Sequence, residues 1–245
     1  MTNIKLVIAY DGTNYHGWQS QANAVTVQDT LVSAIYRGIG EKPILIGSGR
    51  TDAGVHAIAQ VANFHTESDV PPDKMKYVIN AYLPNDIHVM DSSQVPDDFH
   101  AQFSAVRKEY MYKILNAPDP SVFHTNYAYW VGRRLSFEDM ACACKDFLGE
   151  HDFSAFCATG SKVTDFTRRI FRSELEKDGD FIIYTVQGSG FLYNMVRIII
   201  GTLIEIGMGK IPKDAIPSII KGKDRRKAGR TAPPQGLYLK NVYYE

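Results

Sequence analysis

The chain has 245 residues, 44% hydrophobic and 22% charged, which is enough for a substantial core in one large domain or two smaller ones. Its 27 Lys and Arg residues balance 27 Asp and Glu residues. A zero net charge excludes a strongly basic nucleic-acid-binding protein, so an anionic partner would have to bind a local basic patch. No apolar run approaches membrane length, and we expect a cytoplasmic protein.

The first half of the chain predicts elements in the order βαββαβ. Alternating or apolar runs typical of strands lie at 4–10, 43–46, 59–64 and 87–90. Helical spacing of apolar residues follows Thr26, an N-cap type, and ends at Gly38 and Gly40. A second helical pattern runs between Pro71 and Pro84.

The second half shows a similar plan with insertions. Strands are expected at 106–115, at 170–176 and 181–187 as a hairpin, and at 236–244. Helices are expected from Ser136 to Gly149, from about 192 to 206, and over 213–221. The predicted fold is therefore α+β, with two ferredoxin-like (RRM-like) βαββαβ halves whose mixed or antiparallel sheets flank a central cleft. We expect subdomains at 1–104 and 105–245.

A glycine-rich turn, Gly47-Ser-Gly-Arg-Thr-Asp-Ala-Gly-Val-His-Ala57, separates two of the predicted strands. Its sequence matches neither a P-loop nor a dinucleotide-binding fingerprint. Asp52 in such a turn usually bonds only its own backbone. The alternative is a catalytic acid, because chemistry is often placed on constrained loops at strand ends.

A basic segment, residues 221–230, holds six Lys or Arg residues and one Asp. Further basic residues cluster at 133–134, 168–169 and Arg172. A run of charges is usually a solvated surface, but a Lys/Arg loop beside a cleft also suits a phosphate backbone. Because the whole chain is neutral, this asymmetry favours a nucleic-acid-binding face.

Two residues in the second half are candidates for a site. Arg197 lies inside an apolar helical run, and a buried arginine needs a partner. That partner is either Asp52 or an acid in a structural ion pair elsewhere. Tyr110 shares a strand face with Tyr112, where a tyrosine could stack on a base. Since no metal-ligand spacing and no nucleophile-elbow motif occur, a single-carboxylate site without metal or cofactor remains.

Six segments together resemble the TruA-type tRNA pseudouridine synthases. They are Tyr10-Asp-Gly-Thr-Asn-Tyr-His-Gly-Trp-Gln, Gly49-Arg-Thr-Asp-Ala-Gly-Val-His-Ala, Asp98-Phe-His-Ala, Arg107-Lys-Glu-Tyr-Met-Tyr, Phe191-Leu-Tyr-Asn-Met-Val-Arg and Thr231-Ala-Pro-Pro-Gln-Gly-Leu-Tyr-Leu. The segments fall in the family's order and span nearly the whole chain.

The resemblance implies an isomerase that acts on uridines 38, 39 and 40 of the tRNA anticodon stem-loop. Such an enzyme breaks the bond from ribose C1′ to uracil N1, rotates the base and joins C1′ to C5. The resemblance implies that this needs no cofactor and no metal. It also implies that tRNA is the partner and that the protein is a homodimer.

The resemblance also implies roles for single residues. Asp52 is the essential carboxylate, which either attacks C1′ or removes the C2′ proton, and Arg197 is its partner. Tyr110 stacks on the uracil and assists proton transfer at C5, and Leu237 forms the apolar wall of the pocket. Arg50 occupies or stabilises the gap left when the target base is extruded.

Two positions depart from the family pattern. Ser20 and Gln102 stand where the family commonly has arginine, so tRNA binding or the range of sites is affected rather than the reaction.

Two other functions fit parts of the sequence. A non-catalytic RNA-binding module would use the basic segment without forming a product. A metal-free glycosidase would use Asp52, but the turn lacks the second carboxylate which that chemistry usually needs.

Overall fold

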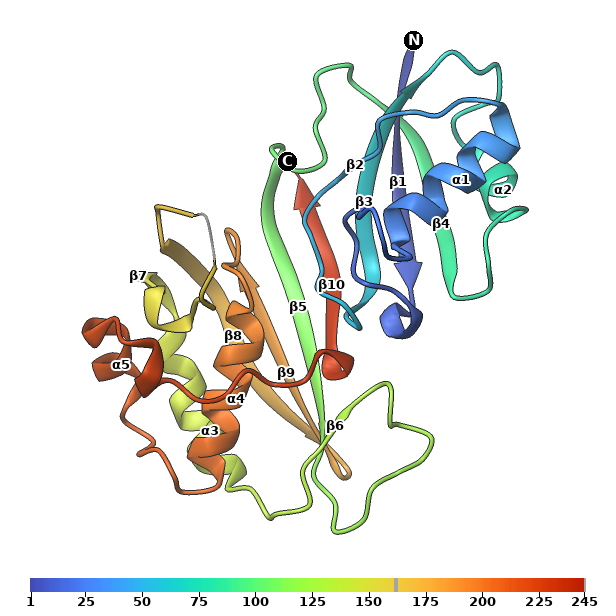
Figure 1. The fold of residues 1–245 in the computed structure, drawn as a ribbon. Coiled ribbons are helices and arrows are strands. Elements are labelled where there is room, and N and C mark those ends of the chain that lie inside the picture. Colours follow the sequence, from blue (N-terminus) through green and yellow to red (C-terminus); the bar gives the residue numbers. More distant parts are fainter. Residues whose placement is uncertain (161–162, 245) are drawn as a thin grey trace. The chain divides into compact units, whose positions relative to one another are not determined.

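The protein is described by a computed structural model that covers residues 1–160 and 163–244. The chain divides into two compact units, Met1–Val106 with Tyr238–Glu245, and Arg107–Leu237. Each unit combines strands with helices, as Figure 1 shows. The predicted α+β class is confirmed.

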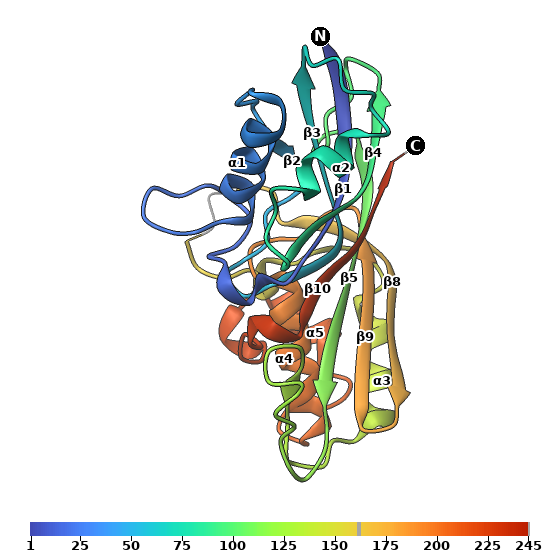
Figure 2. The same cartoon turned by 90° about the vertical axis from the view of Figure 1, so that its right-hand side faces the viewer.

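In the first unit, four strands follow one another in the order β4-β1-β3-β10, and β2 pairs with β3. β1 is antiparallel to both of its neighbours, whereas β10 is parallel to β3. The strands are β1 (Thr2–Tyr10), β2 (Ile46–Gly47), β3 (His56–Thr66), β4 (Ile87–Val95) and β10 (Leu237–Tyr244). The helices are α1 (Val27–Ile39) and α2 (Met75–Asn80), which lie on one face of these strands (Figure 2).

Helix α1 begins and ends at the predicted residues. The Thr26 side chain accepts a hydrogen bond from the Asp29 backbone N–H at 3.2 Å. Gly40 closes the helix with φ 79°, a conformation that favours glycine. Leu31 and Ile35 are fully buried, so the apolar stripe of α1 forms part of the core.

Two predicted elements of this unit are much shorter than expected. The predicted strand 43–46 is wrong over most of its length, because β2 contains only Ile46–Gly47 and Ile44 is 85% exposed. Pro43 has no N–H to donate to a neighbouring strand, which limits pairing there. Helix α2 begins only at Met75, several residues after the prolines that were expected to open it.

In the second unit the strands follow the order β5-β9-β8-β7, all antiparallel to their neighbours, and β6 pairs in parallel with β5. The strands are β5 (Ala105–Leu115), β6 (Tyr129–Trp130), β7 (Gly149–Asp152), β8 (Thr167–Asp178) and β9 (Phe181–Gly188). The helices are α3 (Phe137–Ala143), α4 (Met195–Gly207) and α5 (Ile216–Gly222).

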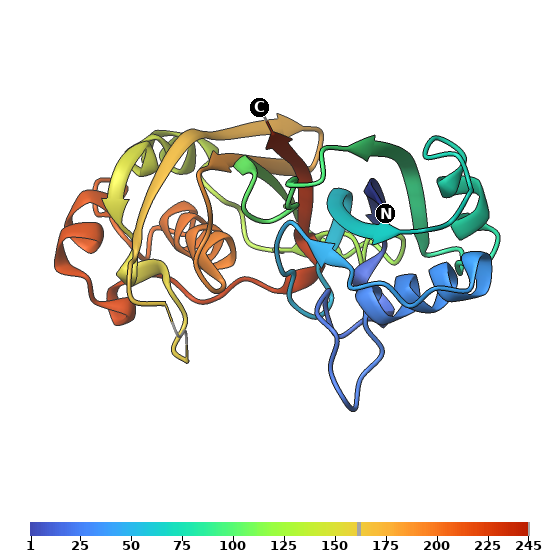
Figure 3. The ribbon, with the colours of Figure 1, turned by 90° about the horizontal axis from the view of Figure 1, so that it is seen from above.

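The predicted hairpin is confirmed, since β8 and β9 pair as neighbours and Gly179 turns the chain with φ 57°. β7 was not predicted, because Gly-Glu-His-Asp carries no apolar alternation. Helix α4 is buried on nearly every side and packs against α3, and Figure 3 shows it among the other elements of this unit. Such a uniformly apolar helix is typical of a core element.

The expected second subdomain, 105–245, includes β10. In the structure Tyr238 and Leu239 of this strand lie beside His56 and Ala57 of β3, in the first unit. In the described residues, 1–160 and 163–244, no helix is both long and apolar enough to cross a membrane.

Candidate functional site

Asp52 lies half-exposed in the turn between β2 and β3. The turn closes on itself, because the Val55 backbone N–H donates to the Asp52 carbonyl at 3.1 Å. Gly54 adopts φ 76°, which requires glycine. The carboxylate therefore projects from a tight backbone turn that follows a short strand.

A second stretch of chain, residues 10–18, holds this turn from both sides. The Trp18 backbone N–H donates to the Thr51 carbonyl at 3.1 Å. The Gly54 N–H donates to the Tyr15 carbonyl at 3.2 Å. The two hydrogen bonds flank Asp52 in the sequence. We call residues 10–18 the clamp.

Two glycines allow the clamp to approach the turn. A β-carbon at Gly12 would lie 2.0 Å from the Val55 carbonyl oxygen, and one at Gly17 would lie 2.4 Å from the Thr51 carbonyl oxygen. Neither space admits a side chain, so glycine is required at both positions. No separate role for the clamp was predicted from the sequence, although its glycines were the available signal.

The base of the turn is buried in the first unit. Nδ1 of His56 lies 3.0 Å from the Gly12 backbone nitrogen and 3.1 Å from a carboxylate oxygen of Asp11. The His56 ring stacks on Tyr238 of β10, with ring centroids 4.8 Å apart. The buried end of the turn is thus tied both to the clamp and to the sheet.

In the second unit, Tyr110 lies on β5 and is 8% exposed. Its ring meets Phe191 edge to face, with centroids 5.1 Å apart and an angle of 85° between planes. Phe191 precedes α4, so this contact ties the Tyr110 ring to the chain that leads into the helix. A side chain held in this way can present one ring face with little loss of conformational freedom.

Arg197 lies in the first part of α4. Its Nε donates to the Ala232 carbonyl at 2.7 Å and its Nη1 donates to Oδ1 of Asn194 at 2.8 Å. These two bonds orient the guanidinium. The expected pairing of Arg197 with Asp52 stays a prediction.

Leu237 and Arg50 complete the predicted set. Leu237 is 6% exposed and follows a short turn whose Gly236 lies against the Tyr112 ring, where a β-carbon would come within 2.6 Å. The Tyr112 hydroxyl donates to the Pro233 carbonyl at 2.7 Å, and burial raises the pKa of this phenol. Arg50 is exposed in the Asp52 turn.

The basic segment is held in place by several of its own charges. Lys223 bonds Asp152 at 2.6 Å and thereby lowers the pKa of that carboxyl. Arg225 donates to the Gly229 carbonyl at 2.9 Å, so its guanidinium helps to fold the segment. The segment is therefore more ordered than a flexible loop of solvated charges.

The remaining charges of the segment differ in their surroundings. Arg226 pairs with Asp224 at 2.9 Å, and this contact lowers the pKa of Asp224 to about 2. Lys221, Lys227 and Arg230 are exposed. Arg172, also predicted to be part of a basic face, pairs with Glu174 at 2.8 Å. Because Lys223, Arg226 and Arg172 each pair with an acid, they offer less positive charge to an anion than the count of basic residues predicts.

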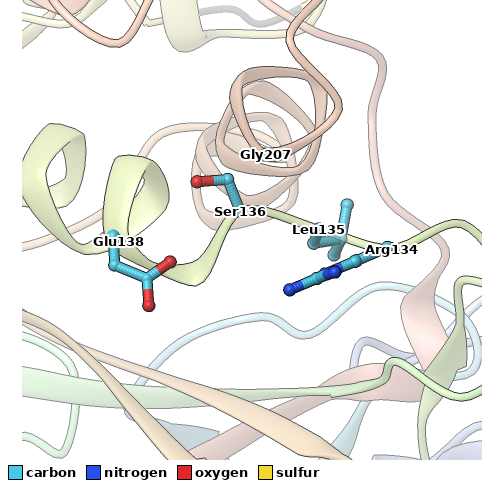
Figure 4. Close-up of a pocket in the computed structure, with 5 residues that line it drawn as sticks. All are labelled: Arg134, Leu135, Ser136, Glu138 and Gly207. Atoms are coloured by element: carbon cyan, nitrogen blue, oxygen red, sulfur yellow. The ribbon is translucent and has the colours of Figure 1, made fainter.

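A pocket of about 320 Å³ opens at the beginning of α3 in the second unit (Figure 4). Its lining is Arg134, Leu135, Ser136, Glu138 and Gly207. None of the predicted site residues takes part in this lining. Among the residues that the structure describes, no group of three or more His, Cys, Asp or Glu side chains could hold a metal ion.

Comparison with known proteins gives one consistent result. The family model for tRNA pseudouridine synthase matches residues 6–104 and 143–245. The tRNA pseudouridine synthase A of Acetivibrio thermocellus is 52% identical over 244 residues, which cover 100% of both chains. The enzymes of the same name from Thermoanaerobacter sp. and Ruminiclostridium cellulolyticum are 50% and 51% identical, also over 100% of both chains.

The matched residues include the Asp52 turn, the clamp, α4 and the basic segment. Full-length identity near one half, together with the family model, identifies the chemistry as the formation of pseudouridine by an isomerase. The chain belongs to the tRNA pseudouridine synthase family.

Proposed function

We propose that this enzyme converts uridine to pseudouridine at positions 38, 39 and 40 of the tRNA anticodon stem-loop. The observation that carries the proposal is the Asp52 turn, where a half-exposed carboxylate stands on a backbone that the clamp holds on both sides. Asp52 is also the residue at which the resemblance to TruA-type enzymes places the essential carboxylate.

The reaction rearranges atoms within one nucleotide. The bond between ribose C1′ and uracil N1 breaks, the base turns, and C1′ bonds to C5. C5 then loses its proton and N1 gains one, so the product has the composition of the substrate. In this proposal Asp52 either attacks C1′ or removes the C2′ proton, and both roles need an ionised carboxylate held close to the ribose.

The other predicted residues act around the same nucleotide in this proposal. Arg197 pairs with Asp52, and its bonds to the Ala232 carbonyl and to Asn194 support that role because they orient the guanidinium. Tyr110 stacks on the uracil and assists proton transfer at C5. Leu237 forms the apolar wall, and Arg50 stabilises the gap left by the extruded base.

Three tRNA transcripts test the choice of sites. Each keeps one uridine among positions 38, 39 and 40 and carries cytidine at the other two. We expect pseudouridine at the single remaining uridine in each transcript and none in a fourth transcript that carries cytidine at all three. Product at uridines elsewhere in the fourth transcript would overturn the anticodon assignment. Mapping pseudouridine in tRNA from cells that lack the protein gives the corresponding result in vivo.

The exposed part of the basic segment is proposed to bind tRNA phosphates. Replacing Lys227 by Gln should weaken tRNA binding for all sequences alike. It should also reduce the magnitude of the slope of log K for binding against the log of the salt concentration by about one. Lys177→Gln is the matched control, because Lys177 is equally an exposed lysine but lies at the end of β8. Equal salt slopes for the two variants would argue against a phosphate contact at Lys227.

We also propose that two copies of the chain form a homodimer, as the family resemblance implies. Sedimentation of the free protein tests this, with an expected mass about twice the 27.5 kDa of the chain. A monomer at working concentrations would contradict it.

A further inference from the structure

We infer that a buried hydrogen bond between Tyr10 and Thr51 positions Asp52 for catalysis. The inference rests on the proposed function, in which Asp52 reacts at the ribose. Tyr10 and Thr51 are positioning residues, since they act through Asp52 and not on the substrate.

The hydrogen bond joins two distant parts of the chain. The Tyr10 hydroxyl lies 2.7 Å from Oγ1 of Thr51. Tyr10 is 4% exposed and Thr51 is 8% exposed, so water does not compete freely for either group. Thr51 immediately precedes Asp52, and its branched side chain has few χ1 choices. The bond to Tyr10 therefore selects one rotamer of Thr51.

The main chain of Thr51 is held as well. Its carbonyl accepts the Trp18 backbone N–H at 3.1 Å. Because a peptide unit is planar, fixing this carbonyl also fixes the plane that contains N and Cα of Asp52. With its side chain and its carbonyl both bonded, Thr51 fixes the peptide unit to which the Asp52 side chain is attached.

Tyr10 is a rigid anchor for this bond. It is the last residue of β1, where it pairs with Ala57 of β3 on one side and with Ile87 of β4 on the other. Its ring also lies 6.2 Å from the Trp18 ring. The Asp52 turn is thus connected through Thr51 and Tyr10 to β1. Sites supported by strands or helices hold their geometry better than sites on free loops.

Loss of either hydroxyl should slow chemistry without changing tRNA affinity. The backbone hydrogen bonds of the clamp and the close contacts of its glycines remain, so the turn persists. The Asp52 side chain gains freedom, and small displacements of a reacting group lower rates by up to about a hundredfold. For one hydroxyl pair we expect the single-turnover rate at saturating enzyme to fall by about tenfold in Tyr10→Phe and in Thr51→Val.

The role of the Tyr10–Thr51 hydrogen bond is tested with four variants and one control. Two of the variants are Tyr10→Phe and Thr51→Val. Thr51→Ser keeps a hydroxyl and should retain most of the rate. The double variant Tyr10→Phe, Thr51→Val should lose no more than either single variant, since both remove one shared bond. Tyr184→Phe is the control, because the Tyr184 hydroxyl lies 2.8 Å from the Ser173 hydroxyl, equally buried but within the second unit. It should leave the rate unchanged.

The readouts are the single-turnover rate, the Kd for tRNA and the melting temperature. Unchanged rates in Tyr10→Phe and Thr51→Val would overturn the inference, as would a tRNA affinity that falls in step with the rate. If Tyr10→Phe fails to fold, the contrast between Thr51→Val and Thr51→Ser decides. Asp52→Asn is measured alongside: an active Asp52→Asn enzyme overturns the proposed function, whereas an inactive one with unchanged positioning variants overturns only the inference.

Discussion

Asp52→Asn should abolish pseudouridine formation while leaving the protein folded and able to bind tRNA. Asparagine has the same shape but cannot act as a base or nucleophile, so we expect the single-turnover rate to fall by at least about a thousandfold. The main-chain bonds that hold the turn use the backbone of residue 52 and of its neighbours. These bonds survive the substitution, and the melting temperature should stay close to that of the original protein.

The matched control is Asp73→Asn, which removes an exposed carboxylate of the first unit that pairs with Lys74 at 3.2 Å. It should have full activity. Pseudouridine mapping on anticodon-stem transcripts gives the rate, and filter binding gives the affinity for tRNA. Undiminished product from Asp52→Asn would show that another group performs the chemistry, and lost tRNA binding would point to a structural role for the carboxylate.

Gly201→Ala should strongly destabilise the second unit. A β-carbon at Gly201 would lie 1.6 Å from the Arg230 carbonyl oxygen. Gly229 approaches the same part of α4, since a β-carbon there would lie 2.6 Å from the Gly201 and Thr202 backbone. Backbone atoms cannot rotate away as a side chain can. The end of the basic segment must therefore separate from α4.

That separation breaks two hydrogen bonds that the close approach makes possible. The Gly229 N–H donates to the Thr202 hydroxyl at 2.8 Å, and the Ala232 N–H donates to the Arg197 carbonyl at 3.0 Å. Overpacking and the lost bonds together should lower the free energy of unfolding by about 3 kcal/mol. Activity should fall too, because Arg197 loses the Ala232 contact that orients its guanidinium.

Gly222→Ala provides the comparison, since a β-carbon at Gly222 in α5 would meet no atom within 4 Å. It should be neutral or slightly stabilising, because alanine favours the helix. Thermal melts and urea titrations of the two variants measure the difference. If Gly201→Ala had the same melting temperature as Gly222→Ala, α4 and the basic segment could separate at little cost in free energy.

Local sequence was sufficient wherever a single segment determines its own structure. Thr26 and Gly40 bound α1 because a cap and a left-handed glycine act within one turn of helix. The β8–β9 hairpin follows from two adjacent strands and Gly179 between them. Helix α4 follows from its apolar run. The family motifs are also local strings, and they singled out Asp52, Tyr110 and Arg197 as candidates.

Local sequence failed where pairing with another segment decides the outcome. β7 has no apolar pattern and exists because β8 offers it a partner. The run before the Asp52 turn has a strand-like composition, yet only Ile46–Gly47 pairs with β3. Within the basic segment, Lys223 meets an acid in β7, which no count of charges along the segment could indicate.

The sequence by itself determined the α+β class, most helices, the β8–β9 hairpin, the family and the identity of the candidate carboxylate. Only the tertiary structure decided what holds the turn around Asp52: the Tyr10 hydroxyl bonds Thr51, and glycines of the clamp, about forty residues earlier in the chain, lie against its backbone. It alone decided that β10 returns to lie beside β3. The physical reason is common to both. Periodicity and turn chemistry report interactions over a few residues, whereas close backbone approach and strand pairing join segments that the sequence keeps far apart.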